Sequence, residues 1–396
     1  MNMNEQMKES EESILHTYNR FPVVFEKGQG CYLYDSEGKE YLDFAAGIAV
    51  NSLGYHYPGY DEALKDQIDK LMHISNLYYN EPIIEAGAKL VKASKMSKAF
   101  FTNSGTEAIE GALKAAKKYA YVRDGHADHE IIAMNHSFHG RSIGALSVTG
   151  TAHYREPFEP LMGGVKFADF NNLESVKAQI TDKTCAIITE VVQGEGGIYP
   201  AKKEFLEGLR QICDEKDIML IFDEIQCGMG RTGHYFAWQA YGVQPDIMTS
   251  AKALGCGVPV GAFVLNEKAA KASLEPGDHG TTYGGNPFVC AAVSKVFDIY
   301  ENDKIIEHVQ EMTPYLEQKL DEIVAKHECA ATRRGMGFMQ GIVIQDRPVG
   351  EVVKAALAKG LLVISAGSDV LRIVPPLVIT KEHIDKMAAI LDECMK

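Results

Sequence analysis

The feature that most constrains the fold is the alternation of short apolar runs with helical stretches between about residues 98 and 266. The runs cover residues 98–101, 130–134, 185–192, 217–222, 247–250 and 260–265. Several runs are apolar on both faces, which is typical of parallel strands covered by helices on either side. The sequence therefore predicts the α/β class, with a mostly parallel central sheet in a large domain.

A change of pattern near residue 290 indicates a second, smaller α+β domain. Helical periodicity covers residues 291–302, 304–327 and 381–395, and residues 349–364 resemble a βαβ unit. The 396 residues exceed a typical domain of about 150 residues. We expect residues 1–55 and 291–396 to build the small domain and residues 56–290 to form the large one.

The charge and the cysteine content of the chain limit which classes of partner and function it can have. The chain has 54 acidic and 40 basic residues, a net charge of −14 that repels nucleic acids and anionic membranes. The eight cysteines form no C-x-x-C pair, and the N-terminus is polar and acidic rather than basic and then apolar. We therefore expect a reduced, cytoplasmic protein with no metal, nucleic-acid or membrane partner.

Small polar residues stand where the run at 98–101 meets the helical stretch 105–121. Ser104, Gly105 and Thr106 would present hydroxyl and backbone N–H donors at the positive end of the helix dipole. This arrangement suits a phosphate monoester. Ordinary N-capping by Ser104 or Thr106 explains the same residues equally well.

An acid and a lysine follow two other strands of the expected sheet. Asp223 ends the run at 217–222, and Lys252 follows the run at 247–250. The carboxyl ends of parallel strands meet at the ligand-binding edge of an α/β sheet. Lysine can bind the aldehyde of pyridoxal 5′-phosphate as a Schiff base, and aspartate can keep its ring nitrogen protonated. Either residue alone is more often a surface charge, but with a phosphate-binding helix start they favour this cofactor.

A glycine-rich segment at 228–233 (GMGRTG) matches the G-x-G-x-x-G pattern of dinucleotide-binding proteins. Residues 223–227 separate it from the strand, and an aromatic pair follows it where a helix is required. We interpret it as a glycine-rich loop, with a nicotinamide dehydrogenase as the weaker alternative.

Further candidates lie at other strand ends. Phe138 could stack on a planar ring, and Arg141 close by could bind a carboxylate. We interpret His139 as a structural histidine. Arg372 stands in an apolar run and needs a carboxylate partner, for which Glu195, flexibly mounted between glycines, is a candidate.

Seven ordered motifs resemble those of one enzyme family. They are 44–51 (FAAGIAVN), 103–108 (NSGTEA), 138–141 (FHGR), 222–226 (FDEIQ), 228–233 (GMGRTG), 251–255 (AKALG) and 281–287 (TTYGGNP). From about residue 21 onward, the chain resembles the class III (subgroup II) pyridoxal-phosphate-dependent aminotransferases, which have the aspartate-aminotransferase fold.

The resemblance implies a role for each matching residue. Lys252 would carry the cofactor, and Asp223 would pair with its ring nitrogen. The other cofactor contacts would be Ser104, Gly105 and Thr106 to phosphate, Phe138 to the ring, Gln226 near the ring hydroxyl, and Thr282 from a neighbouring subunit. The substrate contacts would be Thr281, Ile48, Arg141, Arg372 and Glu195. Sharing Thr282 implies a homodimer.

Within the family, the resemblance is greatest to enzymes that act on N2-acetyl-L-ornithine and 2-oxoglutarate in arginine biosynthesis. Arg141 would bind the distal carboxylate of either substrate, and Arg372 the α-carboxylate that only glutamate or 2-oxoglutarate presents. Glu195 would pair with Arg372 in the other half-reaction. Ile48 stands where ornithine enzymes carry a tyrosine, although it could simply pack in the core. Enzymes acting on 4-aminobutyrate, ornithine, succinylornithine or succinyl-diaminopimelate, and an aminomutase, remain alternatives.

Overall fold

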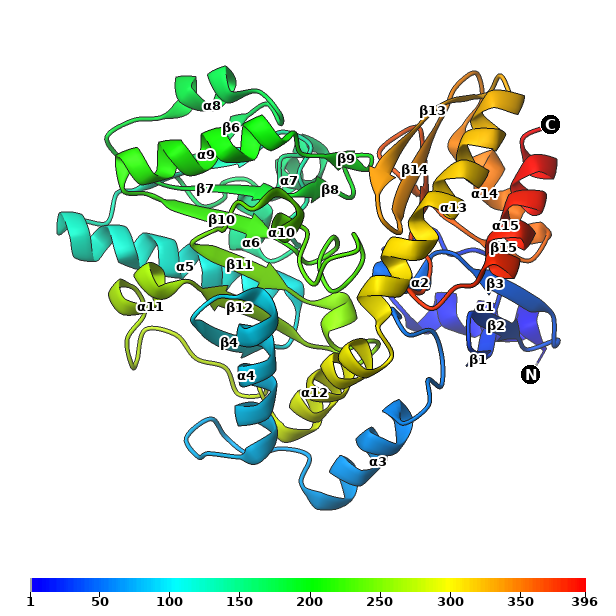
Figure 1. Cartoon of the computed structure of the whole chain (residues 1–396), viewed down its shortest axis with the longest axis horizontal. Helices are drawn as coiled ribbons and strands as arrows, with labels where there is room; N and C mark the ends of the chain where they lie inside the picture. The colour runs from blue at the N-terminus through cyan, green and yellow to red at the C-terminus, as the bar shows by residue number, and fades with distance from the viewer. Residues whose placement is uncertain (1) are drawn as a thin grey trace.

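The computed structural model describes residues 2–396, so that Met1, the first residue of the expected segment 1–55, lies outside the described residues. A seven-stranded sheet forms the centre of the larger part of the molecule (Figure 1). Its strands, in spatial order, are β4 (Lys98–Thr102), β12 (Gly261–Leu265), β11 (Ile247–Ser250), β10 (Met219–Asp223), β7 (Thr184–Glu190), β5 (Glu130–Met134) and β6 (Val165–Ala168).

The expectation of a mostly parallel sheet is confirmed, with one exception. Strands β11, β10, β7, β5 and β6 pair in parallel, whereas β12 is antiparallel to both of its neighbours. The run at 260–265 was expected among the parallel strands, and this was wrong. Only the short loop 251–260 connects β11 to β12, and a parallel pair needs a crossover of a dozen or more residues, usually a helix.

Both faces of this sheet are buried, which explains why its strands are apolar at successive positions. Leu220 and Phe222 belong to one buried cluster, and Met219 and Ile221 belong to the other. The cluster of Met219 contains residues of α5 (Gly105–Asp124) and α11 (Glu267–Ala272). The cluster of Leu220 contains residues of α4 (Glu81–Ser94), α8 (Leu173–Gln179), α9 (Lys203–Lys216) and α12 (Pro287–Asn302). Two layers of helices therefore enclose the sheet.

The N-terminal segment and the chain from about residue 305 onward lie together beside this sheet, on the right in Figure 1. One sheet joins β1 (Phe25–Gln29), β2 (Tyr32–Asp35) and β3 (Glu40–Asp43) to β15 (Leu361–Leu362), which is parallel to β3. The other has the order β13 (Ala330–Met336), β14 (Met339–Ile344), β17 (Val370–Ile373) and β16 (Ile364–Ala366). Helices α13 (Ile305–Lys326), α14 (Val349–Ala358) and α15 (Lys381–Cys394) complete this part. The domain boundaries at residues 55 and 290 stay a prediction.

The βαβ-like unit expected at 349–364 is wrong in its topology. Helix α14 is followed by β15 and β16, but β15 pairs with β3 in one sheet and β16 pairs with β17 in the other. The chain therefore passes between two sheets at residue 363, which the local pattern could not indicate.

Short elements and loops connect these parts. They are α1 (Met3–Ser13), α2 (Ala46–Ala49), α3 (Tyr60–Lys70), α6 (Ile143–Ser147), α7 (Ala152–Arg155), η1 (Glu156–Phe158), β8 (Val192–Gln193), β9 (Tyr199–Pro200), α10 (Trp238–Tyr241) and η2 (Lys252–Leu254). All eight cysteines are free thiols. Among residues 2–396, no helix combines the length and the apolar character that crossing a membrane requires.

Candidate active site

A cavity of about 470 Å³ lies at the carboxyl edge of the central sheet, where the sequence motifs were expected to meet. Its walls bring together three sequence-distant groups: residues 103–106 before α5, residues 138–141 after β5, and the ends of β7, β10 and β11. The lining includes Ser104, Gly105, Thr106, Phe138, Arg141, Glu190, Asp223, Gln226 and Lys252. The edge of the sheet thus collects the predicted cofactor residues of this chain.

Lys252 is the first residue of η2, directly after the loop that leaves β11. Its φ of 50° is in the left-handed region, which is uncommon for a residue with a side chain and often marks a functional site. Burial, followed by the positive charge of Arg372, lowers the pKa of Lys252 to about 8. The neutral fraction near pH 7 is therefore much larger than that of an ordinary lysine, and a neutral amine is the form that attacks a carbonyl group.

Asp223 at the end of β10 is buried and accepts three hydrogen bonds. The donors are His139 Nδ1 at 2.7 Å, Ile225 N at 3.0 Å and Thr249 Oγ1 at 3.1 Å. His139 was interpreted as a structural histidine, and it is almost fully buried. It nevertheless touches the acid predicted to serve the cofactor, so it orients a functional group. Its position next to Phe138, after β5, was the available signal.

Glu190 is a site residue that sequence reasoning missed. It ends β7, and the β7–β10 register places it beside Asp223. Its carboxyl group accepts hydrogen bonds from Gly194 N at 3.1 Å and Phe138 N at 3.3 Å. Burial and the nearby charge of Asp223 raise the pKa of Glu190 well above its usual value, because both disfavour a second buried carboxylate charge. Its place at the end of a parallel strand could have identified it.

The start of α5 provides donors for an anion. The N–H groups of Gly105 and Thr106 belong to the first turn of the helix and have no intrahelical acceptor. A Cβ on Gly105 would lie 2.9 Å from Ile225 Cδ1, so a larger residue would require the Ile225 side chain to shift. Ser104 caps the helix by accepting from Glu107 N at 3.3 Å, whereas the Thr106 hydroxyl contacts Ser142 Oγ at 2.7 Å. Capping and anion binding thus occur at the same helix start.

Arg372 forms a two-pronged ion pair with Glu195. The distances are 2.6 Å from Nη1 to Oε1 and 3.3 Å from Nη2 to Oε2, and Nη1 also donates to Gln226 Oε1 at 3.1 Å. Arg372 is buried on β17, and Glu195 is its carboxylate partner, as the sequence indicated. Arg372 and Lys252 together lower the pKa of Glu195 against the opposing effect of burial.

The glycines around Glu195 also permit close packing of the neighbouring groups. A Cβ on Gly194 would lie 2.4 Å from Gln226 Nε2, and a Cβ on Gly196 would lie 2.6 Å from a backbone oxygen. Arg334 donates from Nε to Gly197 O at 2.6 Å. The backbone that carries Glu195 is therefore held in place, and the side chain is the part that can turn.

Arg141 lies at the cavity with its guanidinium group stacked on aromatic rings. Its Cζ lies 5.4 Å from the centre of the Phe138 ring and 4.1 Å from that of Tyr154. Phe138 is half-buried, and its ring faces Tyr154 edge-on at 5.9 Å. The stack orients the guanidinium group and leaves its N–H donors free for a planar anion.

Five of the predicted substrate or cofactor residues do not line this cavity in the single chain: Thr281, Thr282, Ile48, Glu195 and Arg372. Thr281 contacts its rim, since Asn103 Nδ2 donates to Thr281 Oγ1 at 3.3 Å, whereas Thr282 is exposed. Ile48 is 43% exposed, so the alternative of core packing was wrong. Its side chain lines a neighbouring cavity together with Arg372.

The glycine-rich segment 228–233 is a loop with no helix directly after it, as interpreted from the sequence. Arg231 in this loop is fully buried and donates to the backbone oxygens of Phe338 and Pro375. The segment therefore connects the large sheet to the C-terminal sheet rather than presenting N–H groups to a dinucleotide.

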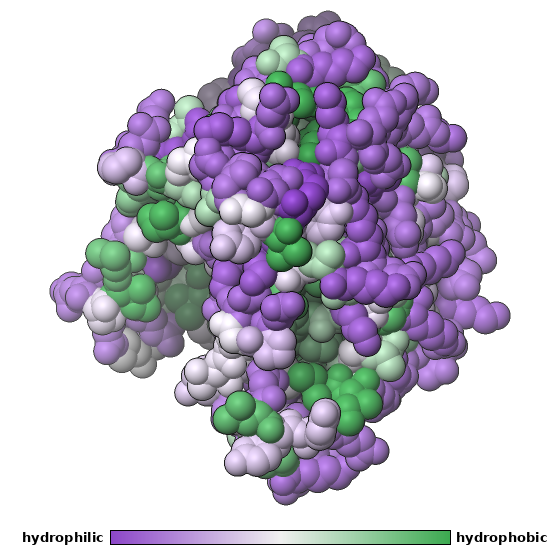
Figure 2. All heavy atoms as spheres, turned by 90° about the vertical axis from the view of Figure 1, so that its left-hand side faces the viewer, coloured by the Kyte–Doolittle hydropathy of each residue, from purple (hydrophilic) through white to green (hydrophobic). Residues whose placement is uncertain are grey.

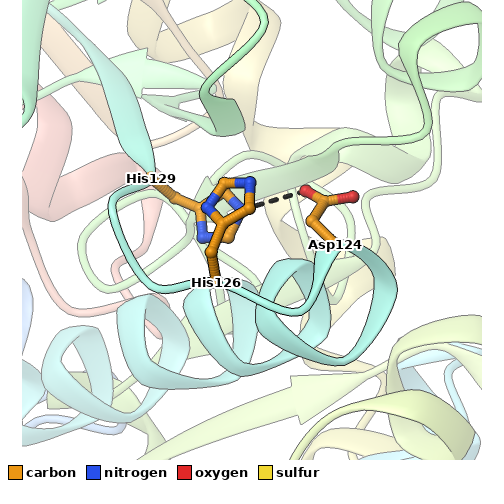
Figure 3. Close-up of side chains that lie close together, drawn as sticks. All are labelled: Asp124, His126 and His129. Carbon is orange, nitrogen blue, oxygen red and sulfur yellow. Dashed lines mark hydrogen bonds and ion pairs between the residues drawn. The ribbon is translucent and has the colours of Figure 1, made fainter.

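A cluster of Asp124, His126 and His129 lies at the C-terminal end of α5, apart from the cavity (Figure 3). Both carboxylate oxygens of Asp124 already accept hydrogen bonds from Arg123 at 2.6 Å. The two imidazole rings are stacked, with 16° between their planes. Their in-plane lone pairs therefore do not converge on one point, and the arrangement is not a ready-made metal site.

The donor set of the main cavity fits pyridoxal 5′-phosphate. It combines a neutral amine on Lys252, a buried acid oriented by His139, free amides at a helix start, and an aromatic wall. These are the groups that the cofactor's aldehyde, ring nitrogen, phosphate and ring face require.

Comparison with known proteins agrees with this chemistry. The family model for class-III aminotransferases matches residues 14–395. An acetylornithine aminotransferase from Clostridium acetobutylicum is 47% identical over 388 residues, covering 98% of this chain and 100% of the relative. The crystal structure of the N-acetylornithine aminotransferase from Stenotrophomonas maltophilia superposes with a TM-score of 0.84 at 34% identity, covering 98% of each chain. That of the ornithine aminotransferase from Toxoplasma gondii gives 0.95 at 28% identity, covering 100% of this chain and 95% of the other. The chain therefore belongs to the class-III aminotransferases, a family of pyridoxal-phosphate-dependent enzymes.

Proposed function

We propose that the protein transfers the δ-amino group of N2-acetyl-L-ornithine to 2-oxoglutarate, giving N-acetylglutamate 5-semialdehyde and glutamate. The observation that carries the proposal is the Arg372–Glu195 ion pair close to Lys252. Relatives named acetylornithine aminotransferase, at 44–48% identity over most of the chain, support the same substrate. This activity would serve arginine biosynthesis in the cytoplasm.

The geometry of the cavity supports an assignment of the cofactor residues. When bound, pyridoxal 5′-phosphate supplies an aldehyde that captures amines and a ring that accepts electrons from the bond broken at the reacting carbon. Lys252 would hold the aldehyde and Asp223 the ring nitrogen, with Phe138 against the ring and Gln226 near its hydroxyl group. The start of α5, from Ser104 to Thr106, would bind the phosphate.

Lys252 would also move the proton during the reaction. Its Nζ would take the proton from the reacting carbon of the substrate and return it to the carbon that comes from the cofactor's aldehyde. A general base works best when its pKa lies near the working pH, and a pKa of about 8 meets this condition. His139 would keep Asp223 oriented throughout.

The two arginines would allow one site to bind two substrates whose carboxylates lie at different positions. Arg141 can bind the carboxylate far from the reacting amine in both substrates. Only glutamate presents a second carboxylate on the reacting carbon itself, and it would bind Arg372. With the ω-amine donor bound, Glu195 satisfies Arg372 and prevents an unpaired buried charge. The tightly packed glycines confine this exchange to a rotation of the Glu195 side chain.

A donor panel tests the proposal. Glutamate formation from 2-oxoglutarate would be measured with N-acetylornithine, ornithine, 4-aminobutyrate and N-succinylornithine as separate donors. We expect the highest kcat/KM with N-acetylornithine, because apolar Ile48 offers no hydrogen bond to a free α-amine. A preference of tenfold or more for another donor would reject the substrate but not the family.

The same panel with Glu195→Ala tests the ion pair. Without its partner, Arg372 stays free for an α-carboxylate, so preference should shift towards α-amino donors such as glutamate by about tenfold or more. Glu195→Gln is the size-matched control for the loss of charge. An unchanged ratio between glutamate and N-acetylornithine would contradict the role of Glu195.

We also propose a homodimer with shared sites. Thr282 is exposed and lies next to Tyr283 in a loop that Asn76 ties to the loop between α3 and α4, through a hydrogen bond to Gly284 O at 2.8 Å. The second loop carries Leu77 and Tyr79, which are 87% and 96% exposed. Apolar exposure of this extent marks an interface, and a second copy would bring Thr282 to the phosphate of its neighbour.

A further inference from the structure

A second cavity, of about 1050 Å³, is lined by Arg372, whose hydrogen-bond partner Gln226, at 3.1 Å, lines the Lys252 cavity. Helix α14, the segment 19–23 and the start of β16 form its walls. Arg372 and Ile48 line it, and Val50, two residues after Ile48, lines the Lys252 cavity. The side chain expected to bind the α-carboxylate can therefore be approached from this cavity.

The charges around this cavity have one sign. Its ionisable lining residues are Arg20, Lys39, Tyr41, Lys354 and Arg372, and no aspartate or glutamate lines it within residues 2–396. The chain as a whole carries a net charge of −14, so a cavity with only cationic charges departs from the general field of the molecule. Low-dielectric walls with charges of one sign concentrate the field and attract ions of the opposite sign.

Two lysines provide most of the uncompensated charge. The ammonium group of Lys39 donates to Ala358 O at 2.9 Å and lies 4.8 Å from the centre of the Tyr41 ring. Neither Lys39 nor Lys354 has a carboxylate within ion-pair distance in the described chain, and both are exposed. Arg20 is partly neutralised by Glu11 at 3.4 Å, and Arg372 is paired with Glu195.

We propose that this cavity is an entrance that collects dicarboxylate anions and delivers them to Arg372. Lys39 and Lys354 attract the dianion at the opening, and the apolar wall of Val353, Leu357 and Ile364 gives it no competing polar partner. Arriving at Arg372, the dianion offers a carboxylate that can replace Glu195. The inference rests on the proposed function, since it concerns the 2-oxo acid of that reaction.

The two substrates differ in charge, which makes the test selective. 2-Oxoglutarate carries two negative charges at neutral pH, whereas N-acetylornithine carries one negative and one positive charge. Removing cations from the opening should therefore slow the association of 2-oxoglutarate and leave the association of N-acetylornithine unchanged. Salt screens the field and weakens electrostatic steering. The effect of removing the lysines should therefore be largest at low ionic strength.

The experiment compares Lys39→Gln, Lys354→Gln and their double variant with the wild-type holoenzyme. We expect the double variant to lower kcat/KM for 2-oxoglutarate by about three- to tenfold at low ionic strength, with kcat unchanged. Its kcat/KM should also depend less on salt than that of the wild type. The value for N-acetylornithine should stay the same.

Lys359→Gln is the matched control. Lys359 directly follows α14, does not line the cavity, and is paired with Glu393 at 2.6 Å. The Lys359→Gln substitution removes one positive charge from the same region without changing the opening. It should leave kcat/KM for 2-oxoglutarate unchanged. An equal loss in the control, or an equal loss for both substrates in the double variant, would overturn the proposal.

Binding of glutarate separates this inference from the proposed function. Glutarate has the same charge as 2-oxoglutarate but no keto group, and calorimetry and stopped-flow mixing report its affinity and association rate without turnover. The double variant should lower the association rate and leave the dissociation rate nearly unchanged. If N-acetylornithine proves not to be the donor, this measurement still tests whether the cavity is an entrance for dianions. An unchanged association rate would reject the proposed entrance.

Discussion

At the scale of single residues, the site depends on ionisable groups whose pKa values differ from those in water. Burial and Arg372 lower the pKa of Lys252 to about 8, while burial and the charge of Asp223 raise the pKa of Glu190. Both shifts have the same physical cause, because a low-dielectric site disfavours the charged form of either group. The protein pays for this arrangement in stability, since both groups carry their usual charge in the unfolded chain.

Lys252 should therefore reduce the stability of the cofactor-free protein in a pH-dependent way. Its pKa falls from about 10.4 in the unfolded chain to about 8 in the folded one, so stability rises with pH between these values. At pH 7 the penalty is fully present, and Lys252→Met should raise the free energy of unfolding by up to about 3 kcal/mol.

Urea unfolding of both proteins at pH 7 and near pH 10.5 measures this difference. The gain from Lys252→Met should be largest at pH 7 and should nearly vanish at the higher pH, because the amine is then mostly neutral in both states. A gain that stays constant with pH would contradict the shift. The variant should also lack turnover while keeping its fold.

At the scale of elements, the turn α2 is the most unusual segment near the site. Four successive residues, Ala46 to Ala49, have φ between 48° and 65°, which makes α2 one turn of left-handed helix. Such a turn costs about 1–2 kcal/mol for each residue with a side chain. Asp43 holds it by accepting from Ala45 N and Ala46 N at 2.9 and 2.8 Å, and Tyr55 donates to Asp43 at 2.8 Å. The strain presents Ile48 to the cavity beside Arg372.

Gly47→Ala should lower the free energy of unfolding by about 1–2 kcal/mol, because it adds a side chain at a left-handed position. The new Cβ would also lie 3.3 Å from Asn51 Nδ2. Gly87→Ala is the control in α4, where the nearest atom to a new Cβ is 4.0 Å away. It should stabilise the protein by about 0.5–1 kcal/mol. Thermal and urea unfolding would measure both, and a shift of the same sign in both would refute the strain argument.

At the scale of the whole molecule, exposed apolar side chains point to assembly. Figure 2 shows a mostly hydrophilic face on which hydrophobic groups gather at the lower end, where Figure 1 places the loop between α3 and α4. Leu77 and Tyr79 in this loop are almost completely exposed in the single chain. A second copy would remove them from water, which stabilises association in proportion to the apolar area buried.

Sedimentation should therefore give a mass twice the 43.6 kDa of one chain. Leu77→Glu together with Tyr79→Glu should shift the protein towards monomer, because charges would be buried at the interface without partners. Activity should fall with the dimer fraction, since Thr282 would no longer reach the neighbouring site. A charge change at exposed Lys177, which pairs with Glu174, is the control and should leave the mass unchanged. A wild-type mass of one chain would refute the dimer.

Several parts of the site could be predicted because they depend on local pattern. Asp223 and Lys252 were located from strand ends, and the start of α5 was located from its small polar residues. His139 and Glu190 were not assigned their contacts, since nothing near either residue in the sequence shows that His139 touches Asp223 or that Glu190 touches Phe138. Those contacts join positions about 85 residues apart for His139 and Asp223, and only packing brings them together.

The sequence alone determined the sheet class, the positions of its main strands along the chain and the edge at which chemistry occurs. Hydrophobic periodicity and strand-end residues are local properties, and they persist whatever surrounds them. The tertiary structure alone decided that β12 runs antiparallel, that α2 is left-handed and that the Arg372 cavity is lined by cations without acids. Each of these depends on which distant segments pack together, and that is a property of the complete fold.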